Sequence, residues 1–310
     1  MSKSAKKIGL IIGQEWEWPE AFMKAVNESE ENVTAELVKL GGTFMDEPCD
    51  YDVIIDRISH EIPYYRAYLK YASIHGTYII NNPYTTSADS KFSGTVLVNK
   101  LGLKSPRTVV LPNKQVEYDV TPNTFRNLIY PMDWQAIIDY VGVPAIFKDN
   151  KATGRRGVAR VHNVDELIQR YDESSTRTKI LQQIIESDQH VHSFVIGQEK
   201  VLSLNYSVKH GRYQQNILDN NSPLGQTLAK DALRITRAYQ YDINMVEFVI
   251  KDDIAYVING TYPAPDINQT LLTEEQFQWF VVEIAALAID RAKRPLPQTG
   301  VFSQPDHTSS

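Results

Sequence analysis

The sequence predicts a protein of the α/β class with two or three packed domains, and three observations support this. Its 310 residues include 42% hydrophobic and 23% charged side chains, the balance of an ordinary globular protein. Near the amino end, an apolar run at Lys7–Gly13 predicts a strand, and Glu15–Asn27 after it predicts a helix. Near the middle, Val143–Val161 predicts two strands around a basic turn. A strand, a loop and a helix in succession are typical of the start of an α/β unit.

Charge, cysteine content and hydropathy restrict the class of function. The net charge is −6 and the isoelectric point about 5.7, so we expect no nucleic-acid partner, because such partners select a basic surface. Cys49 is the only cysteine, which excludes an internal disulfide and a multi-cysteine metal site. The apolar run GLIIG is too short for a signal peptide, and no run reaches the roughly 18 residues of a membrane span. We therefore expect a cytoplasmic protein that binds no membrane.

The first part of the chain alternates predicted strands and helices. Further strands are expected at Val33–Leu40, Tyr51–Arg57 and Thr77–Asn81, and a helix at Pro63–His75. In an open α/β sheet, ligands bind beyond the carboxyl ends of the strands. Four residues follow such ends and are candidates for binding a second substrate: Glu15, Trp16, Arg57 and His60. The alternative for each of them is an ordinary solvated loop residue.

A long helix is predicted to open the next part of the chain. It covers Thr86–Leu101, and Gly102 ends it in the usual way. An extended stretch at Arg107–Leu111 follows, and residues 112–131, which include three prolines, are predicted to form a loop. A helix at Asp133–Val141 then leads to the central hairpin.

The central stretch Val143–Val161 combines a lysine with a flexible basic turn. Lys148 stands at the polar exit of the first predicted strand. The turn after it contains four residues suited to an anion: Gly154, Arg155, Arg156 and Gly157. Glycine lets backbone N–H groups approach an anion, and the cationic side chains neutralise it. The stretch therefore predicts a site for nucleotide phosphates, although neither GxxxxGK[ST] nor GxGxxG is present. The alternative is a solvated hairpin with a glycine turn.

Turn and capping signals predict the remaining elements. Asn163 can cap a helix at Asp165–Tyr171, and the capping box Thr273-x-x-Gln276 opens the last helix, Thr273–Ala292. Between these helices we expect five strands and a further helix: strands at Lys179–Ile185, Val191–Ile196, Lys200–Val208, Asn244–Ile250 and Ile254–Ile258, and a helix at Leu224–Tyr239. The tail from Pro295 is expected to be disordered.

The order of these pieces resembles the ATP-grasp superfamily, which includes glutathione synthase, D-alanine ligase and the peptide-tagging glutamate ligases. The segment ADSK, ending at Lys91, is similar to the family's helix whose lysine approaches the nucleotide phosphates. The segment LGLKSP, Leu101–Pro106, resembles the exit into the central lobe. Lys148 falls on the strand lysine that contacts the phosphates, and Gly154–Gly157 falls on the flexible glycine-rich loop. The matches span nearly the whole chain.

This resemblance implies an ATP-grasp fold of mixed α/β and α+β class, in which two α+β lobes enclose the nucleotide. It divides the chain into an N-terminal α/β domain at residues 1–84, a central lobe at 85–183, a C-terminal lobe at 184–294 and a disordered tail at 295–310. The segment QQII, Gln182–Ile185, is similar to the part that joins the lobes and reads adenine, which gives that role to Gln183 and Ile184. Gln183 replaces the usual acid there. His190 and His192 lie where the family often has an acid and an arginine that contact ribose and phosphate.

The resemblance also implies Mg²⁺ ions that bridge the phosphates. Glu247 suits the first metal-binding acid, whereas Asn259 and Thr261 stand where a glutamate and an asparagine are expected. Both remain oxygen donors, which Mg²⁺ prefers, but a formal charge is lost. We therefore expect weak Mg²⁺ binding, or the recruitment of nearby Asp266 or Asn268.

The activity that the resemblance implies is an ATP-dependent ligase that joins a carboxylate to an amine or a thiol through an acyl phosphate. Its partners would be small-molecule or peptide carboxylates and amines, and a homodimer is left open. Catalysis would rest on positioning and on neutralisation of phosphoryl charge by Mg²⁺ and by four cationic residues: Lys91, Lys148, Arg155 and Arg156. Two alternatives stay open. One is a nucleotide-binding sensor or scaffold with weakened or lost catalysis, which the residues at 183, 259 and 261 favour, and the other is a phosphotransferase acting on a hydroxyl group.

Overall fold

The computed structural model describes residues 5–117, 121, 124–151, 157–187 and 189–298. The chain folds into two compact units. The first contains Met1–Ala88, His192–Val246 and Thr261–Ser310, and the second contains Asp89–Val191 and Glu247–Gly260. Strands β9 (Gln189–Ile196) and β12 (Ile243–Lys251) contribute residues to both units. Among the described residues, no helix combines the length and the apolarity that crossing a lipid bilayer requires.

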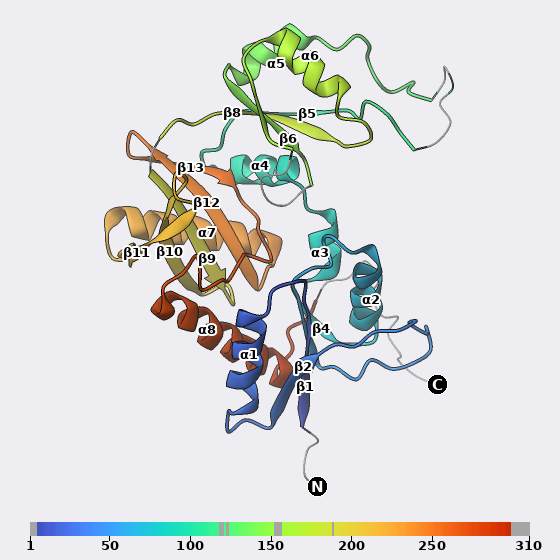
Figure 1. The fold of residues 1–310 in the computed structure, drawn as a ribbon, viewed down its shortest axis with the longest axis vertical. Helices are drawn as coiled ribbons and strands as arrows, with labels where there is room; N and C mark the ends of the chain where they lie inside the picture. Colours follow the sequence, from blue (N-terminus) through green and yellow to red (C-terminus); the bar gives the residue numbers. More distant parts are fainter. Residues whose placement is uncertain (1–4, 118–120, 122–123, 152–156, 188, 299–310) are drawn as a thin grey trace. The chain divides into compact units, whose positions relative to one another are not determined.

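The amino-terminal part of the first unit is the α/β unit that the sequence predicts. Its parallel sheet has the strand order β2-β1-β3-β4 (Figure 1). The strands and helices are β1 (Lys6–Ile11), α1 (Glu17–Asn27), β2 (Val33–Leu37), β3 (Val53–Asp56), α2 (Pro63–Ile74) and β4 (Tyr78–Ile80). Because all four strands are parallel, their carboxyl ends meet at one edge of the sheet, followed in sequence by Arg57 and Asn81.

A second sheet, with the strand order β11-β10-β9-β12-β13, is antiparallel at its β10–β11 and β12–β13 pairs. Its other strands are β10 (Lys200–Ser207), β11 (Arg212–Ile217) and β13 (Ile254–Asn259). The helices in this part of the chain are α7 (Pro223–Tyr239) and α8 (Glu274–Lys293). Strand β11 was not predicted, because its residues RYQQNI have little apolar alternation. The strand exists because it pairs with β10 and because Gln276 donates from its side chain to the carbonyls of Gln214 and Gln215. Tertiary contacts thus replaced the missing local signal.

One apolar core lies within the first unit, where the parallel sheet, β9 and β10 pack with helices α1 and α8. It includes Ile8 of β1, Trp18 and Phe22 of α1, Phe194 of β9 and Phe280 of α8, all at most 1% exposed. The capping box predicted for the last helix is present, since Thr273 accepts from the Gln276 N–H and Gln276 accepts from the Thr273 N–H. The apolar stripe of α8 explains why this helix is central to the core.

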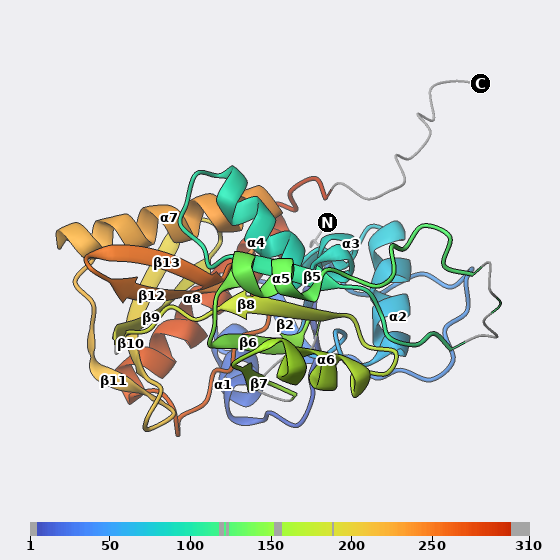
Figure 2. The same ribbon diagram turned by 90° about the horizontal axis from the view of Figure 1, so that it is seen from above.

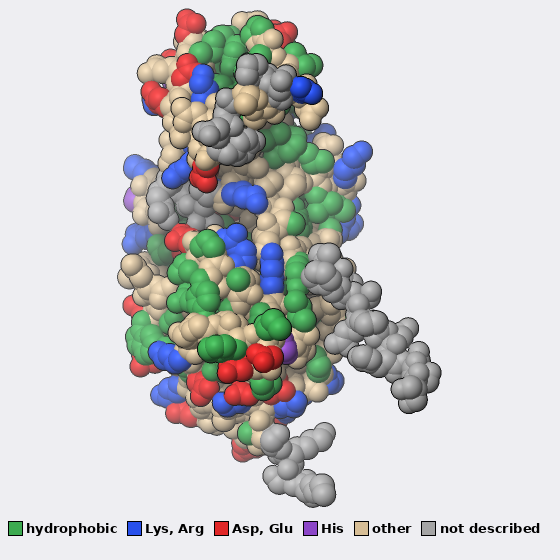
Figure 3. Space-filling view, turned by 90° about the vertical axis from the view of Figure 1, so that its right-hand side faces the viewer, with side chains coloured by type: hydrophobic (Ala, Val, Ile, Leu, Met, Phe, Trp, Pro, Cys, Tyr) green, Lys and Arg blue, Asp and Glu red, His purple; other side chains and the backbone are tan. Residues whose placement is uncertain are grey.

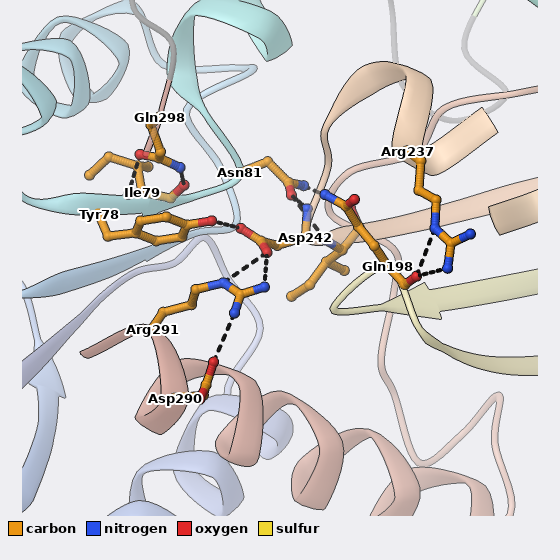
Figure 4. Close-up of polar contacts among 10 residues, drawn as sticks. Tyr78, Ile79, Asn81, Gln198, Arg237, Asp242, Asp290, Arg291 and Gln298 are labelled. Atoms are coloured by element: carbon orange, nitrogen blue, oxygen red, sulfur yellow. Dashed lines mark hydrogen bonds and ion pairs between the residues drawn. The ribbon is translucent and has the colours of Figure 1, made fainter. Parts of the chain in front are cut away.

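A buried polar network crosses the same core (Figure 4). The Tyr78 hydroxyl donates to Asp242 at 2.5 Å, and Arg291 donates from two nitrogens to the other carboxylate oxygen at 3.0 and 3.2 Å. Burial raises the pKa of Asp242, against the lowering effect of Tyr78 and Arg291. The Asn81 side chain accepts from the N–H groups of Asp242 and Ile243. The network therefore ties the end of β4 to the start of β12 and to α8.

The second unit contains a four-stranded sheet of order β5-β8-β6-β7 whose neighbouring strands are all antiparallel. Helices α5 and α6 pack with it around a separate apolar core that includes Ile138, Phe147, Leu167 and Leu181 (Figure 2). Its elements are β5 (Thr108–Leu111), α5 (Trp134–Val141), β6 (Ala145–Asp149), β7 (Ala159–Val161), α6 (Val164–Asp172) and β8 (Lys179–Gln183). Asn163 caps α6 as predicted, accepting from the Glu166 N–H.

The single helix predicted for Thr86–Leu101 is wrong, because the chain forms two helices there. α3 (Pro83–Ala88) ends before Asp89, and α4 (Lys91–Lys100) begins after Ser90. The Ser90 hydroxyl accepts from the Ser93 N–H, and the Ser93 hydroxyl accepts from the Ser90 N–H. This pair forms a capping box, which begins a new helix at the point where the sequence pattern seemed continuous.

Two surface features bear on the expectations above. The face shown in Figure 3 carries basic, acidic and hydrophobic side chains. In the predicted tail, the Gln298 side chain accepts from the Ile79 N–H at 3.0 Å and donates to the Ile79 carbonyl at 2.7 Å (Figure 4). The tail thus pairs with β4 at Gln298, and residues 299–310 lie outside the described part of the chain.

Candidate functional site

Lys148 and Lys91 are brought together by the residue two positions after Lys148. Lys148 lies near the carboxyl end of β6, and Asn150 follows that strand. The Asn150 carbonyl accepts from the Lys91 N–H at 2.9 Å, and its side-chain oxygen accepts from the Phe92 N–H at 3.0 Å. Asn150 therefore holds the first turn of α4 beside the end of β6. No sequence pattern predicts this contact. A helix start left without these acceptors would expose unpaired N–H groups.

The two lysines share one electrostatic environment with Glu247. Burial lowers the pKa of Lys148 to about 8, with Lys91 adding to the shift and Glu247 opposing it. Burial likewise lowers the pKa of Lys91, against the attraction of Glu247, Asp149 and Asp89. A buried ammonium whose pKa falls is one whose lost hydration the protein does not fully replace. For both lysines, burial outweighs the attraction of the nearby carboxylates.

Asp149, the neighbour of Lys148 in sequence, forms a separate ion-pair group. It is 5% exposed, pairs with Lys179 and accepts from Arg177 at 3.0 Å. Gly157 lies nearby with φ at +68°, a conformation that favours glycine, and a β-carbon there would lie 3.8 Å from Asp149 Oδ2 and from Lys179 Nζ. The other predicted loop residues, Gly154, Arg155 and Arg156, lie outside the described residues.

The residues assigned to the nucleotide base follow β8. The Gln183 side-chain oxygen accepts from the Arg107 N–H at 3.2 Å, and the Gln183 N–H donates to the Arg107 carbonyl at 2.9 Å. Ile184 is half-buried, and its backbone makes no backbone hydrogen bond to the described residues. Ile184 directly follows the last residue of β8.

The candidate metal ligands lie on two paired strands. Glu247 of β12 and Asn259 of β13 are opposite each other in the register, at a point where the pairing shifts between Glu247 and Phe248. Both are half-buried. Within the described ranges, no group of three or more His, Cys, Asp and Glu side chains could hold a metal ion. Glu247 and Asn259 offer one carboxylate and one amide oxygen, which are donor types that Mg²⁺ prefers. Thr261, 9% exposed, belongs to the first unit.

The two candidate histidines have different surroundings. His190 Nε2 lies 3.1 Å from the Ser187 carbonyl, to which only a protonated Nε2 can donate. His192, in the first unit, stacks on Tyr206 with 4.5 Å between ring centroids, and its Nδ1 lies 2.9 Å from the Tyr213 hydroxyl. His192 is therefore held by aromatic packing rather than projected into solvent.

The candidate substrate residues of the first unit include one buried ion pair. Arg57 is 6% exposed and donates to both carboxylate oxygens of Glu15, at 2.7 and 2.8 Å. It also donates to the Pro265 carbonyl at 2.7 Å and lies over the Trp18 ring. Trp16 is 49% exposed. His60 is also exposed, and desolvation lowers its pKa against the opposing charges of Asp56 and Glu61.

Arg57 is one of several groups that hold the segment after β13 by its backbone. Asn81 donates to the Pro263 carbonyl at 3.2 Å, and Asn244 accepts from the Tyr262 N–H at 2.8 Å. Glu17 accepts from the Gln269 N–H at 3.2 Å. Arg57 was predicted as a site residue from its place after a strand. The contacts of Asn81 and Glu17 with this segment were not predicted, because their partners lie far away in sequence.

Comparisons with known proteins bear on the fold of the chain. No protein-family model matches the sequence, and no characterised protein matches it by sequence similarity. Among solved structures, D-alanine–D-alanine ligase from Bacillus anthracis complexed with ATP matches with a TM-score of 0.64 at 15% identity, over 94% of this chain and 98% of that one. A RimK-domain ATP-grasp protein from Sphaerobacter thermophilus matches with a TM-score of 0.65 at 17% identity, over 93% and 99%.

A third match is the ATP-grasp ligase PsnB complexed with the precursor peptide PsnA2 and AMPPNP. Its TM-score is 0.62 at 13% identity, over 93% of this chain and 99% of that one. The chain therefore has the ATP-grasp fold, which confirms the fold class expected from the sequence. At these identities the likeness shows the fold, and the site must support the function.

Proposed function

We propose that the chain is an ATP-dependent ligase that joins a carboxylate to an amine or a thiol and holds ATP with residues of its second unit. The observation that carries this is Lys148, whose ammonium has a neutral hydrogen-bond partner, Gln182, and a second lysine in its field. Glu247 is the carboxylate that acts on it. A partly buried cation is stabilised when an anion pairs with it, and a triphosphate supplies the negative charge for such a pair.

The other residues that the sequence predicts for the nucleotide are assigned as follows. Lys91 and Lys148 would bind phosphate oxygens, and the backbone of Gln183 and Ile184 would bind the adenine edge. We assign closure over the phosphates to Gly154, Arg155, Arg156 and Gly157, and ribose or phosphate contacts to His190 and His192. Bound ATP would supply the phosphoryl group that activates the carboxylate. The protein contributes fixed cations, which stabilise the charge that develops on the transferring group.

Mg²⁺ binding is proposed for Glu247 and Asn259, with Thr261 as a further oxygen donor. The pairing of Glu247 with Asn259 across two strands supports this, since both side chains offer oxygen. With one protein carboxylate, we expect the ion to bind well only together with the nucleotide phosphates. ATP and Mg²⁺ should therefore bind cooperatively.

The second substrate is proposed to bind at the carboxyl edge of the parallel sheet in the first unit. Glu15 and Arg57 are engaged with each other, so Trp16 and His60 are the more available of the four candidates. PsnB was solved with a precursor peptide, and a peptide or small-molecule carboxylate is the partner we propose here. We also retain as proposals the three-domain division, a cytoplasmic location and a homodimer.

The test is a calorimetric titration with a non-hydrolysable ATP analogue, with and without Mg²⁺, followed by a turnover assay. The assay incubates the protein with Mg²⁺·ATP, a panel of amino acids and short peptides, and hydroxylamine. Hydroxylamine traps an acyl phosphate as a hydroxamate, which is measured directly. Nucleotide binding with hydroxamate formation supports the ligase, and absence of nucleotide binding contradicts it.

A second candidate is a nucleotide-binding protein with weakened or lost turnover. The specific observation that favours it is the amide of Asn259 opposite Glu247, in place of a second carboxylate. In this case the analogue should bind, and ADP should not be released with any carboxylate of the panel. ADP release above the rate without protein would contradict this candidate.

A further inference from the structure

Four residues of the second unit form a hydrogen-bond chain that ends on Lys148. The Thr108 hydroxyl donates to the Pro106 carbonyl at 3.0 Å. The Gln182 side-chain nitrogen donates to the Thr108 oxygen at 3.1 Å, and the Gln182 side-chain oxygen accepts from Lys148 Nζ at 2.8 Å. Gln182 is 4% exposed, so water does not compete at its amide. The chain joins β5, β8 and β6, which are neighbours in one sheet.

The direction of every hydrogen bond in this chain is fixed by its two ends. A backbone carbonyl only accepts, so the single Thr108 proton points at Pro106. Thr108 then offers Gln182 a lone pair, which requires the amide NH₂ on that side and the amide oxygen on the other. At the far end an ammonium only donates, and it meets that oxygen. The two ends therefore demand the same amide orientation.

The terminal acceptor is neutral, and this matters for the charge of Lys148. A carboxylate at position 182 would hold the ammonium equally well in direction but would cancel its charge. The amide orients the ammonium without cancelling its charge. The charged groups that face Lys148 from the other elements are Glu247 of β12 and Lys91 of α4. The lowered pKa of Lys148 is consistent with a neutral partner.

We propose that Thr108 and Gln182 are positioning residues, which aim the Lys148 ammonium through a hydrogen-bond chain of fixed polarity and keep its charge available to an anionic ligand. The inference rests on the proposed nucleotide site as far as the ligand is concerned. The orientation of the lysine itself is a property of the nucleotide-free protein. The two can therefore fail separately.

The first measurement is the pKa of Lys148 in the nucleotide-free protein, which NMR of the lysine side chain determines. Gln182→Glu should raise this pKa well above about 8, because a carboxylate stabilises the ammonium. Thr108→Val should lower it, because the amide loses the acceptor that sets its orientation. Thr108→Ser keeps the hydroxyl and should restore the wild-type value. An unchanged pKa in both Gln182→Glu and Thr108→Val overturns the proposal, whatever the protein binds.

The second measurement is calorimetric titration with a non-hydrolysable ATP analogue and Mg²⁺ at pH 7.5. Gln182→Glu should bind about tenfold more weakly, the change expected when one charge-assisted contact is weakened. Thr108→Val should bind several-fold more weakly, and Thr108→Ser like the wild type. The matched control is Gln115→Glu, which adds the same charge at an exposed amide whose oxygen already accepts from Ser175. It should leave the affinity within about twofold of wild type.

The pH profile separates positioning from a purely structural role. Wild-type affinity should fall as pH rises above about 8, where Lys148 loses its proton, and in Gln182→Glu the fall should move to higher pH. A structural role would lower the melting temperature of the variant and leave the profile in place. A folded Gln182→Glu protein with wild-type affinity and profile would refute the positioning role. A wild-type protein that binds no nucleotide would instead refute the proposed function, and the lysine pKa values would still decide the positioning.

Discussion

Replacing Lys148 with methionine should stabilise the nucleotide-free protein at neutral pH while weakening nucleotide binding. Burial lowers the pKa of Lys148 from 10.5 to about 8, which corresponds to a cost of at most roughly 3 kcal/mol for keeping the ammonium charged in the folded state. Methionine has a similar length and no charge, so it removes this cost. It also leaves the buried Gln182 oxygen without its donor, which costs about 1–3 kcal/mol. The net gain is therefore between zero and about 2 kcal/mol.

The direction of the pH dependence follows from the lowered pKa. In the unfolded chain the lysine keeps its proton up to 10.5, whereas in the folded protein it loses it near 8. Between these values the unfolded chain binds more protons, so the stability of the wild type rises with pH. The cost is complete below pH 8 and absent above 10.5. The stability of the variant relative to wild type should thus fall by up to about 3 kcal/mol across this window.

Urea unfolding of both proteins at pH 7 and pH 10 measures the stability difference, because other titrating groups are common to both. Calorimetry at pH 7 should show analogue binding weakened by about 1.5–3 kcal/mol, the worth of a charge-assisted hydrogen bond in a partly closed site. A stability difference that does not change with pH would refute the buried-charge reasoning. Wild-type affinity in a folded variant would refute the assignment of Lys148 to the phosphates.

Three further predictions follow from other parts of the molecule. Asn259→Glu places a carboxylate opposite Glu247, which should lower the stability of the ligand-free protein by about 0.2–1 kcal/mol, and Mg²⁺·ATP should restore this stability. Thermal unfolding with and without Mg²⁺·ATP measures the change. If Mg²⁺·ATP gives the variant no gain in stability, Asn259 does not belong to the metal site. Arg57→Met leaves Glu15 and the Pro265 carbonyl without their donor and should lower the free energy of unfolding in urea by about 3 kcal/mol. This is the low end for a broken buried ion pair, because Glu15 is 26% exposed. A loss below about 1 kcal/mol would contradict a stabilising role of Arg57 in holding Glu15 and Pro265. Thr273→Ala removes the cap of α8 and should cost about 1 kcal/mol, with Thr273→Ser as the control that retains it.

The sequence by itself determined most of the secondary structure and the order of its pieces. Periodicity and caps are local signals, so Asn163, the Thr273–Gln276 box and the strand carrying Lys148 could be read directly. The sequence-based predictions were wrong or absent where the local pattern was misleading or missing, as in the helix interrupted at Ser90 and in β11. The turn between β12 and β13 depends on local structure, since Asp252 and Asp253 both have positive φ, as a tight hairpin turn requires.

Only the tertiary structure decided how the site residues are held. Gln182 reaches Thr108 across 74 positions, Arg57 reaches Glu15 across 42, and Asn150 reaches Phe92 across 58. No sequence pattern specifies such pairs, because a polar side chain finds its partner through the packing of distant strands. The same packing sets the charge balance, since the pKa of Lys148 depends on burial and on Glu247 and Lys91, which lie far from it in sequence. The residue types thus predicted an anion site, and the folded sheet brings Gln182 to Lys148 and Thr108 to Gln182.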